Sequence, residues 1–154
     1  MRAEDILRIT SFLDTVFEEF ETISALATGA CGSELLHAAV FDKRIQKVCL
    51  LHPFISYADI VLHREYSPAY IPSTVAGAIE KYDLPDLMAA LSPRKLLIIN
   101  PRSGNGNPVE EAQKSCRLSY PRMVYNQQGP GHHFEHMVLD DGKKVNELIK
   151  IWLK

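Results

Sequence analysis

The first forty residues combine two periodicities of apolar side chains. Up to residue 20, apolar residues recur at helical spacing on one face, and the glutamates at 18, 19 and 21 lie outside that face. The apolar positions are Ile6, Leu7, Ile9, Leu13, Val16, Phe17 and Phe20. A short apolar run at residues 22–28 then predicts a buried strand. Gly29 ends this run, and a helical pattern resumes from Ser33 to Val40.

The rest of the chain contains three more segments that are predicted to be strands. They are Val48–His52, which ends before Pro53, then Leu96–Asn100 and Arg122–Asn126. Leu96–Asn100 is the clearest, because an unbroken apolar run is typical of a parallel strand that is covered on both faces. Helical patterns are predicted at residues 84–91, 109–118 and 143–153. Residues 54–92 form a more polar segment that ends in the first of these helices.

The alternation of strands with helices predicts an α/β fold with about four parallel strands flanked by helices. No repeat, low-complexity tract or Pro/Gly linker divides the sequence, so residues 1–154 are predicted to form a single domain. In such folds the chemistry lies in loops at the carboxyl ends of the strands. Three informative loops are predicted at that edge, at residues 29–33, 101–108 and 127–137.

Composition and charge narrow the function classes. Hydrophobic residues make up 46% of the 154 residues and charged residues 23%, which is typical of a folded globular domain. The net charge is −2 and no basic block is present, so no nucleic-acid partner is expected. No apolar run approaches membrane-spanning length, so no membrane partner is expected. The first residues lack the apolar core of a signal peptide, which makes the cytoplasm the default unless an upstream export signal has been removed.

The three cysteines, Cys31, Cys49 and Cys116, are widely spaced and include no C-x-x-C pair. Such an odd, scattered set argues against a disulfide framework or a zinc ribbon, and fits a reducing compartment or buried thiols. The glycines of residues 101–108 are not followed by the Gly-Lys-Ser/Thr of a phosphate-binding loop. No cofactor is therefore expected.

The segment Thr28-Gly-Ala-Cys-Gly-Ser33 joins the first predicted strand to the next helix. In the nucleophile elbow, G-x-nucleophile-x-G, small residues permit a sharp turn that exposes the nucleophile. Gly29 holds the first position, Cys31 the nucleophile position, and Ser33 replaces the final glycine. A thiol at a helix N-terminus can attack as the thiolate. The alternative, which the pentapeptide taken alone favours, is that Gly29 ends a strand and Cys31 is a small buried side chain.

Residues 128–136, Gln-Gly-Pro-Gly-His-His-Phe-Glu-His, directly follow the fourth predicted strand. A histidine on a glycine-rich loop after a late strand has the freedom that a general base needs, and His132 is the candidate. His132 and His136 are also four residues apart, which suits a metal ion on a helix. The glycines and proline before His132 favour a loop instead, so no metal site is predicted. His133 and His136 are expected to be structural.

The loop after Leu96–Asn100 is where the order nucleophile, acid, histidine places a catalytic carboxylate. Residues 101–108, Pro-Arg-Ser-Gly-Asn-Gly-Asn-Pro, contain no Asp or Glu. Asn105 or Asn107 can orient an imidazole, as asparagine does in Cys-His-Asn sites. The alternative, which we favour, is an Asn/Gly turn without chemistry.

These elements, in this order, resemble the α/β-hydrolase superfamily, especially bacterial acetyl xylan esterase and dienelactone hydrolase-like proteins. The resemblance covers nearly the whole chain after residue 20 and is most specific at residues 23–42, 82–100 and 129–134. By position it implies that Cys31 is the nucleophile and His132 the catalytic histidine. It also implies that the backbone N–H of Gly32 is an oxyanion-hole donor. Gly104 stands where these families have an aspartate.

The resemblance also implies which parts of the fold are absent. The strand that bears the elbow is the fifth of eight in these families, so the chain corresponds to the C-terminal half and lacks the loop that supplies a second oxyanion donor. We therefore expect an esterase-like domain with a degenerate triad and weak or no hydrolysis of a small ester or acylated carbohydrate. The alternative is a non-catalytic half-domain that acts in assembly or accessory binding, or a fragment of a longer esterase.

A half-sheet of this kind leaves its first strand, residues 22–28, as an open edge with unpaired backbone groups. Pairing two copies of the chain is the simplest closed way to cover such an edge. A homo-oligomer is therefore expected.

Overall fold

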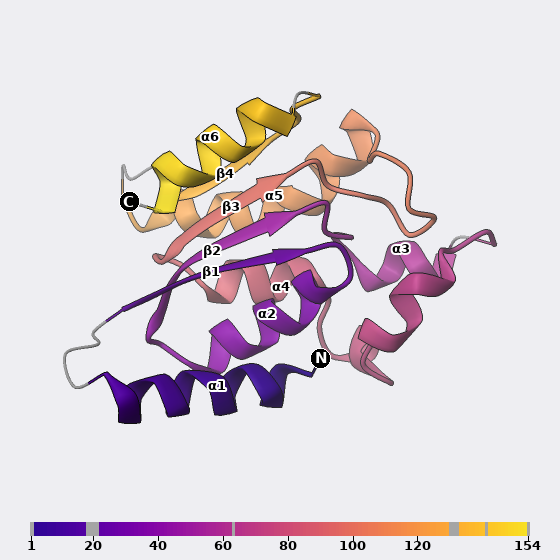
Figure 1. The fold of residues 1–154 in the computed structure, drawn as a ribbon. Helices are drawn as coiled ribbons and strands as arrows, with labels where there is room; N and C mark the ends of the chain where they lie inside the picture. Colours follow the sequence, from indigo (N-terminus) through magenta and orange to yellow (C-terminus); the bar gives the residue numbers. More distant parts are fainter. Residues whose placement is uncertain (1, 18–21, 63, 130–132, 141, 154) are drawn as a thin grey trace.

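A computed structural model describes the chain except for residues 1, 18–21, 63, 130–132, 141 and 154. The described residues form a single four-stranded sheet in which all strands are parallel. Its order is β1 (Ile23–Thr28), β2 (Ile45–Leu51), β3 (Lys95–Ile99) and β4 (Phe134–Met137) (Figure 1). The predicted α/β class, with about four parallel strands flanked by helices, is confirmed.

Helices cover the two faces of the sheet unequally (Figure 1). They are α1 (Ala3–Val16), α2 (Cys31–Phe41), α3 (Tyr57–Leu62), α4 (Leu84–Ala90), α5 (Glu111–Gln127) and α6 (Gly142–Leu153), with short 3-10 turns η1 (Pro68–Ser73) and η2 (Ala78–Glu80). Side chains of α2, α4 and α5 form the larger apolar core with one face of the sheet. α6 packs on the opposite face, against β2, β3 and β4. Within the described ranges, none of the helices combines the length and apolar character that crossing a membrane requires.

The burial of each strand follows its sequence pattern. In β3, the four residues Leu96–Ile99 are fully buried and alternate between the two cores. Each such side chain contributes about 1.5–3 kcal/mol when it leaves water. β1 instead alternates between partly buried and exposed residues, and Leu26 is 44% exposed. Its only strand partner in the described chain is β2, so β1 forms one edge of the sheet.

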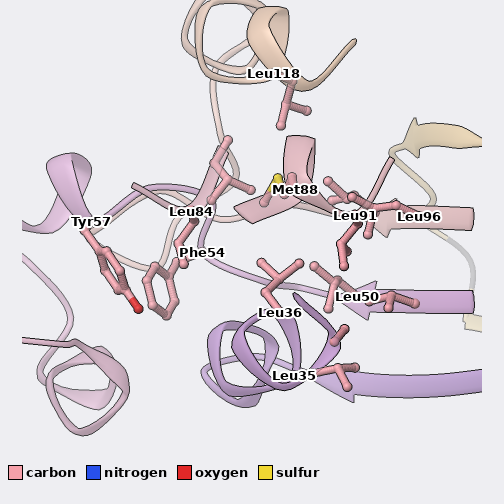
Figure 2. Close-up of a cluster of buried hydrophobic side chains, with 14 of the residues drawn as sticks. Leu35, Leu36, Leu50, Phe54, Tyr57, Leu84, Met88, Leu91, Leu96 and Leu118 are labelled. Atoms are coloured by element: carbon pink, nitrogen blue, oxygen red, sulfur yellow. The ribbon is translucent and has the colours of Figure 1, made fainter. Parts of the chain in front are cut away.

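The larger core is built from side chains of both helices and strands, as Figure 2 shows. Leu36 of α2, Leu50 of β2 and Leu96 of β3 are each almost completely buried there. They lie with Leu84, Met88, Leu91 and Leu118, which come from α4, the residue after it and α5. This single contact region fixes α2, α4 and α5 on the same face of the sheet.

The predicted fourth strand is wrong. Residues 122–126 lie inside α5, and the fourth strand is β4, which pairs Phe134 with Leu96. The short apolar run at residues 123–125 is compatible with either a buried helix or a strand, so tertiary contacts decide between them. Tyr125 is 5% exposed, its ring lies 5.3 Å from that of Phe134, and its hydroxyl donates to the Arg94 carbonyl at 2.8 Å. These contacts hold residues 122–126 in their helical position.

A polar network joins α1 to the turn between α2 and β2. Thr10 is 3% exposed and donates its hydroxyl to Asp42 Oδ2 at 2.7 Å, while Arg44 Nη2 lies 2.8 Å from the same oxygen. The hydrogen bond from Arg44 is the main reason that the pKa of Asp42 is lowered to about 2. α1 ends at Val16, earlier than predicted, and the expected helical residue Phe20 lies outside the described residues.

Candidate functional site

The carboxyl ends of all four strands lie at one edge of the sheet, because the strands are parallel (Figure 1). The segments that leave β1, β2, β3 and β4 there are residues 29–30, 52–56, 100–110 and 138–140. Open α/β sheets bind ligands at this edge. We call it the carboxyl edge.

The structure places Cys31 at the strand-to-helix turn at this edge. Gly29 ends β1 with a φ of 59°, in the left-handed region, and Cys31 is the first residue of α2. The free thiol is partly exposed. A Cβ on Gly32 would lie 3.2 Å from the Cβ of Pro53, so the turn and the segment after β2 approach closely. The local geometry is therefore that of a sharp, glycine-dependent turn.

The predicted oxyanion donor is already engaged. The N–H of Gly32 donates to the Gly29 carbonyl at 3.2 Å, inside the turn itself. Ser33, which replaces the final glycine of the elbow, is 2% exposed and donates its hydroxyl to the Ser73 carbonyl at 3.0 Å. The Ser33 carbonyl in turn lies 2.7 Å from Nδ1 of His37. The described contacts at this turn thus stabilise it and tie it to η1.

Gly104, at the position of the expected acid, is buried against backbone. A Cβ built on Gly104 would lie 2.3 Å from the carbonyl oxygen of Asp59 and 2.7 Å from the amide nitrogen of Ile60. The carbonyl of Gly104 also accepts from the N–H of Ser67 at 2.8 Å. Asp59 is itself held, because its carboxylate accepts from Arg117 at 2.8 and 3.0 Å. This position has no room for any side chain.

The two asparagines of the loop shape the loop itself. The amide oxygen of Asn105 accepts from the Ser103 hydroxyl and from the backbone N–H of Asn107, the latter at 3.0 Å. The Asn107 carbonyl accepts from the Ser103 N–H at 2.9 Å, and its side chain is exposed. These are the contacts of an Asx turn, in which asparagine bonds nearby backbone. They agree with the alternative of an Asn/Gly turn.

The candidate histidine, His132, lies outside the described residues. The described residues around it correct one expectation: the histidine-rich segment does not follow the fourth strand, because it begins directly after α5 and its last three residues belong to β4. His133, just before β4, accepts at its carbonyl from the Leu96 N–H at the amino end of β3, at 2.6 Å. His133 is therefore at the edge opposite Cys31. Residues 138–154, which follow β4, contain no histidine.

The last histidine of the segment, His136, lies within β4. Burial, and then the charges of Arg122 and Lys114, lower the pKa of His136. Arg122 Nη2 lies 3.2 Å from His136 Nδ1, an arrangement in which a neutral imidazole accepts the hydrogen bond. His136 thus contacts α5, which agrees with the expected structural role.

Sequence reasoning missed a cavity of about 550 Å³ at the carboxyl ends of β2, β3 and β4. Its walls include His52, Asn100, Arg102, Lys114 and Asp140, together with the first turns of α5 and α6. The sequence did contain an indication of two of these residues, because His52 and Asn100 are polar and directly follow apolar strands.

Backbone strain marks the rim of this cavity. His52 and Asn100 both have positive φ, 53° and 52°, a region that residues other than glycine rarely adopt. Strained residues concentrate at functional sites. The amide of Asn100 holds the segment after β4, because it donates to the Leu139 carbonyl at 2.8 Å and accepts from the Leu139 N–H at 2.7 Å. The cavity is therefore walled by three strand ends held in a fixed relation.

The described residues contain no group of three or more His, Cys, Asp or Glu side chains that could hold a metal ion.

Comparison of the chain with known proteins found no matching family model, no matching curated protein and no matching solved structure.

Proposed function

We propose that this chain is an α/β-hydrolase-like domain that has lost ester turnover and acts by binding. The strand, elbow-like turn and helix at Cys31 support the kinship, together with the all-parallel sheet. The observation that carries the loss of turnover is the close packing of Gly104 on the backbone of Asp59. The space that an aspartate side chain would need at residue 104 is filled by this backbone, which supports the proposed loss.

The chemistry explains why this packing matters. A catalytic imidazole needs an orienting group, and its loss costs about 10⁴ in rate at a Ser-His-Asp site. An oxyanion donor is worth about 10²–10³, and the N–H of Gly32 is bonded within its own turn. A Cys31 thiolate could still displace the alcohol of an activated ester and keep the acyl group as a thioester. Without a positioned base to activate water, that thioester would persist.

We predict that p-nitrophenyl acetate releases at most one p-nitrophenolate per chain. The assay should use a Cys116→Ala background, because Cys116 is an exposed thiol that can also be acylated. Burial raises the pKa of Cys49 to about 11, which keeps that thiol protonated and unreactive. Stopped-flow absorbance should show a single burst, and intact mass should show one acetyl group. Both should vanish when Cys31→Ala is added.

The opposite outcome is equally clear. Steady-state release that continues for many turnovers in the Cys116→Ala chain, and is abolished by both Cys31→Ala and His132→Ala, would establish a working hydrolase and overturn the proposal.

We also propose that the β1 edge pairs with the β1 edge of a second copy. Among the described strands only β2 pairs with β1, and the exposed Leu26 lies on this edge strand. An edge strand offers unpaired N–H and C=O groups, and two-fold pairing of identical edges satisfies both copies at once.

Size exclusion with light scattering should therefore give twice the 17.4 kDa mass of the chain at micromolar concentration. Leu26→Lys places a charge on the edge and should shift the mass to 17.4 kDa. Ile151→Lys is the matched control, because Ile151 is 72% exposed on α6, whose side chains pack on β2, β3 and β4. A wild-type monomer, or equal loss of the dimer in both variants, would contradict edge pairing.

A further inference from the structure

We infer that the cavity at the carboxyl ends of β2, β3 and β4 binds a small hydroxylated carboxylic acid, whose carboxylate pairs with Arg102. Its volume of about 550 Å³ is in the range of small-molecule sites. Neither Cys31 nor Gly104 is among the residues that line it. The inference therefore goes beyond the proposed function and does not depend on the outcome of the turnover assay.

Arg102 differs from the other partly buried arginines in the described chain. Arg44 and Arg117 each pair with a carboxylate at 2.8 Å, and Arg94 donates to four backbone carbonyls. Arg102 has no carboxylate within ion-pair distance among the described residues, and its guanidinium meets only His52 Nδ1, at 3.5 Å. A partly desolvated guanidinium favours an anionic partner, and its planar fork matches a carboxylate.

The other charged groups of the cavity determine which anion fits. Lys114 has a side-chain exposure of 7% and is neutralised by Glu111, whose Oε2 lies 2.5 Å from Nζ. Asp140 also lines the cavity and is exposed. Because Glu111 is paired with Lys114, Asp140 is the carboxylate that repels the doubly charged form of phosphate more strongly than a singly charged carboxylate.

The same walls favour hydroxyl groups on the ligand. Asp140 offers acceptors, and the amide of Asn146 on α6 offers both a donor and an acceptor. His52 adds a ring nitrogen at the end of β2. The side-chain amide of Asn100, in contrast, hydrogen-bonds the backbone of Leu139 through both its nitrogen and its oxygen. Asn100 therefore shapes the cavity wall and is not expected to bind the ligand. A carboxylate at Arg102 with hydroxyls toward Asp140 and Asn146 uses these groups together.

The first turns of α5 and α6 reinforce this polarity. Glu111 opens α5 and Gly142 opens α6, and both residues line the cavity. The free N–H groups at the start of a helix favour negative charge nearby. They add to the attraction of Arg102 for a carboxylate.

The test is calorimetric titration of D-glucuronate into the purified full chain, with D-glucose and inorganic phosphate as parallel probes. Glucuronate should bind, and glucose and phosphate should each bind at least about tenfold more weakly, because they lack the carboxylate or add charge. Arg102→Gln should weaken glucuronate about tenfold or more. Arg8→Gln, which removes the same charge from a side chain on α1 that is 74% exposed and does not line the cavity, should leave the affinity unchanged.

Three results would overturn the inference: no binding of glucuronate, unchanged binding in Arg102→Gln, or phosphate binding as tight as that of glucuronate. Thermal melting should establish that each variant is folded. If Arg102→Gln does not fold, Asn146→Ala provides the test at an exposed position of α6, where severalfold weaker binding is expected and unchanged binding would count against the site.

Discussion

Gly104→Ala should lower the free energy of unfolding by about 3 kcal/mol, near the upper end for overpacking in a buried region. The added Cβ would stand 2.3 Å from the Asp59 carbonyl oxygen and 2.5 Å from its carbon. These are backbone atoms, so no rotamer change can relieve the overlap. The segment around Asp59 cannot move freely either, because the Arg117 guanidinium holds its carboxylate.

Urea unfolding followed by circular dichroism measures this loss. Gly142→Ala is the matched control, since a Cβ there meets nothing within 4 Å, and its stability should stay within about 0.5 kcal/mol of the parent. Gly104→Asp should be at least as destabilised and should gain no esterase turnover. A stable Gly104→Asp chain that hydrolyses p-nitrophenyl acetate would show that the acid position is open and would refute the proposed function.

Arg94→Met should cost about 4 kcal/mol, the largest effect that we expect from a single substitution away from the apolar core. Arg94 Nη1 donates to the carbonyls of Ala39 at 2.6 Å, Ile45 at 2.9 Å and Asp42 at 3.2 Å, and Nε donates to Leu91 at 3.3 Å. Burial lowers the pKa of Arg94, which shows that its charge is partly desolvated. Hydrogen bonds from a charged donor are worth about 1.5–3 kcal/mol each, and the carbonyls left behind lose their partner.

Chemical denaturation of Arg94→Met, Arg94→Lys and Lys95→Met separates the contributions. Lysine keeps the charge and its ammonium has three donors, but its side chain is shorter and lacks the Nε–H that donates to Leu91, so its loss of stability should be intermediate. Lys95 is the exposed neighbour at the start of β3, and its substitution should have little effect. Equal stabilities for Arg94→Met and Lys95→Met would mean that the carbonyl contacts contribute nothing measurable.

The two positions bear differently on function. Arg94 joins the end of α2 to the start of β2, far from the carboxyl edge, and its loss should weaken the whole fold. Gly104 lies in the loop that follows β3, at the carboxyl edge itself. Its closure against Asp59 therefore connects stability with the proposed absence of turnover. Under the proposed function, filling this position adds stability without a cost in catalysis.

The sequence by itself determined the fold class and most of the elements. Residues 96–99 are apolar without interruption, and a strand of this kind requires cover on both faces, which predicts a parallel sheet between helices. The position of Cys31 was also readable, because Gly29 can adopt a positive φ between a strand and a helix at little cost. Local pattern and final structure agree here, since the same short-range forces decide both.

Only the tertiary structure decided the rest, because contacts between residues distant in sequence outweigh local preference. Residues 122–126 read as a strand, yet the contacts of Tyr125 with Phe134 and Arg94 hold them in α5. The sequence shows that residue 104 is a glycine. It does not show that the backbone of Asp59, 45 positions earlier in the chain, leaves no room for a side chain there. The cavity at Arg102 is lined by the ends of three strands and the first turns of two helices. No local sequence pattern predicts that these segments lie together.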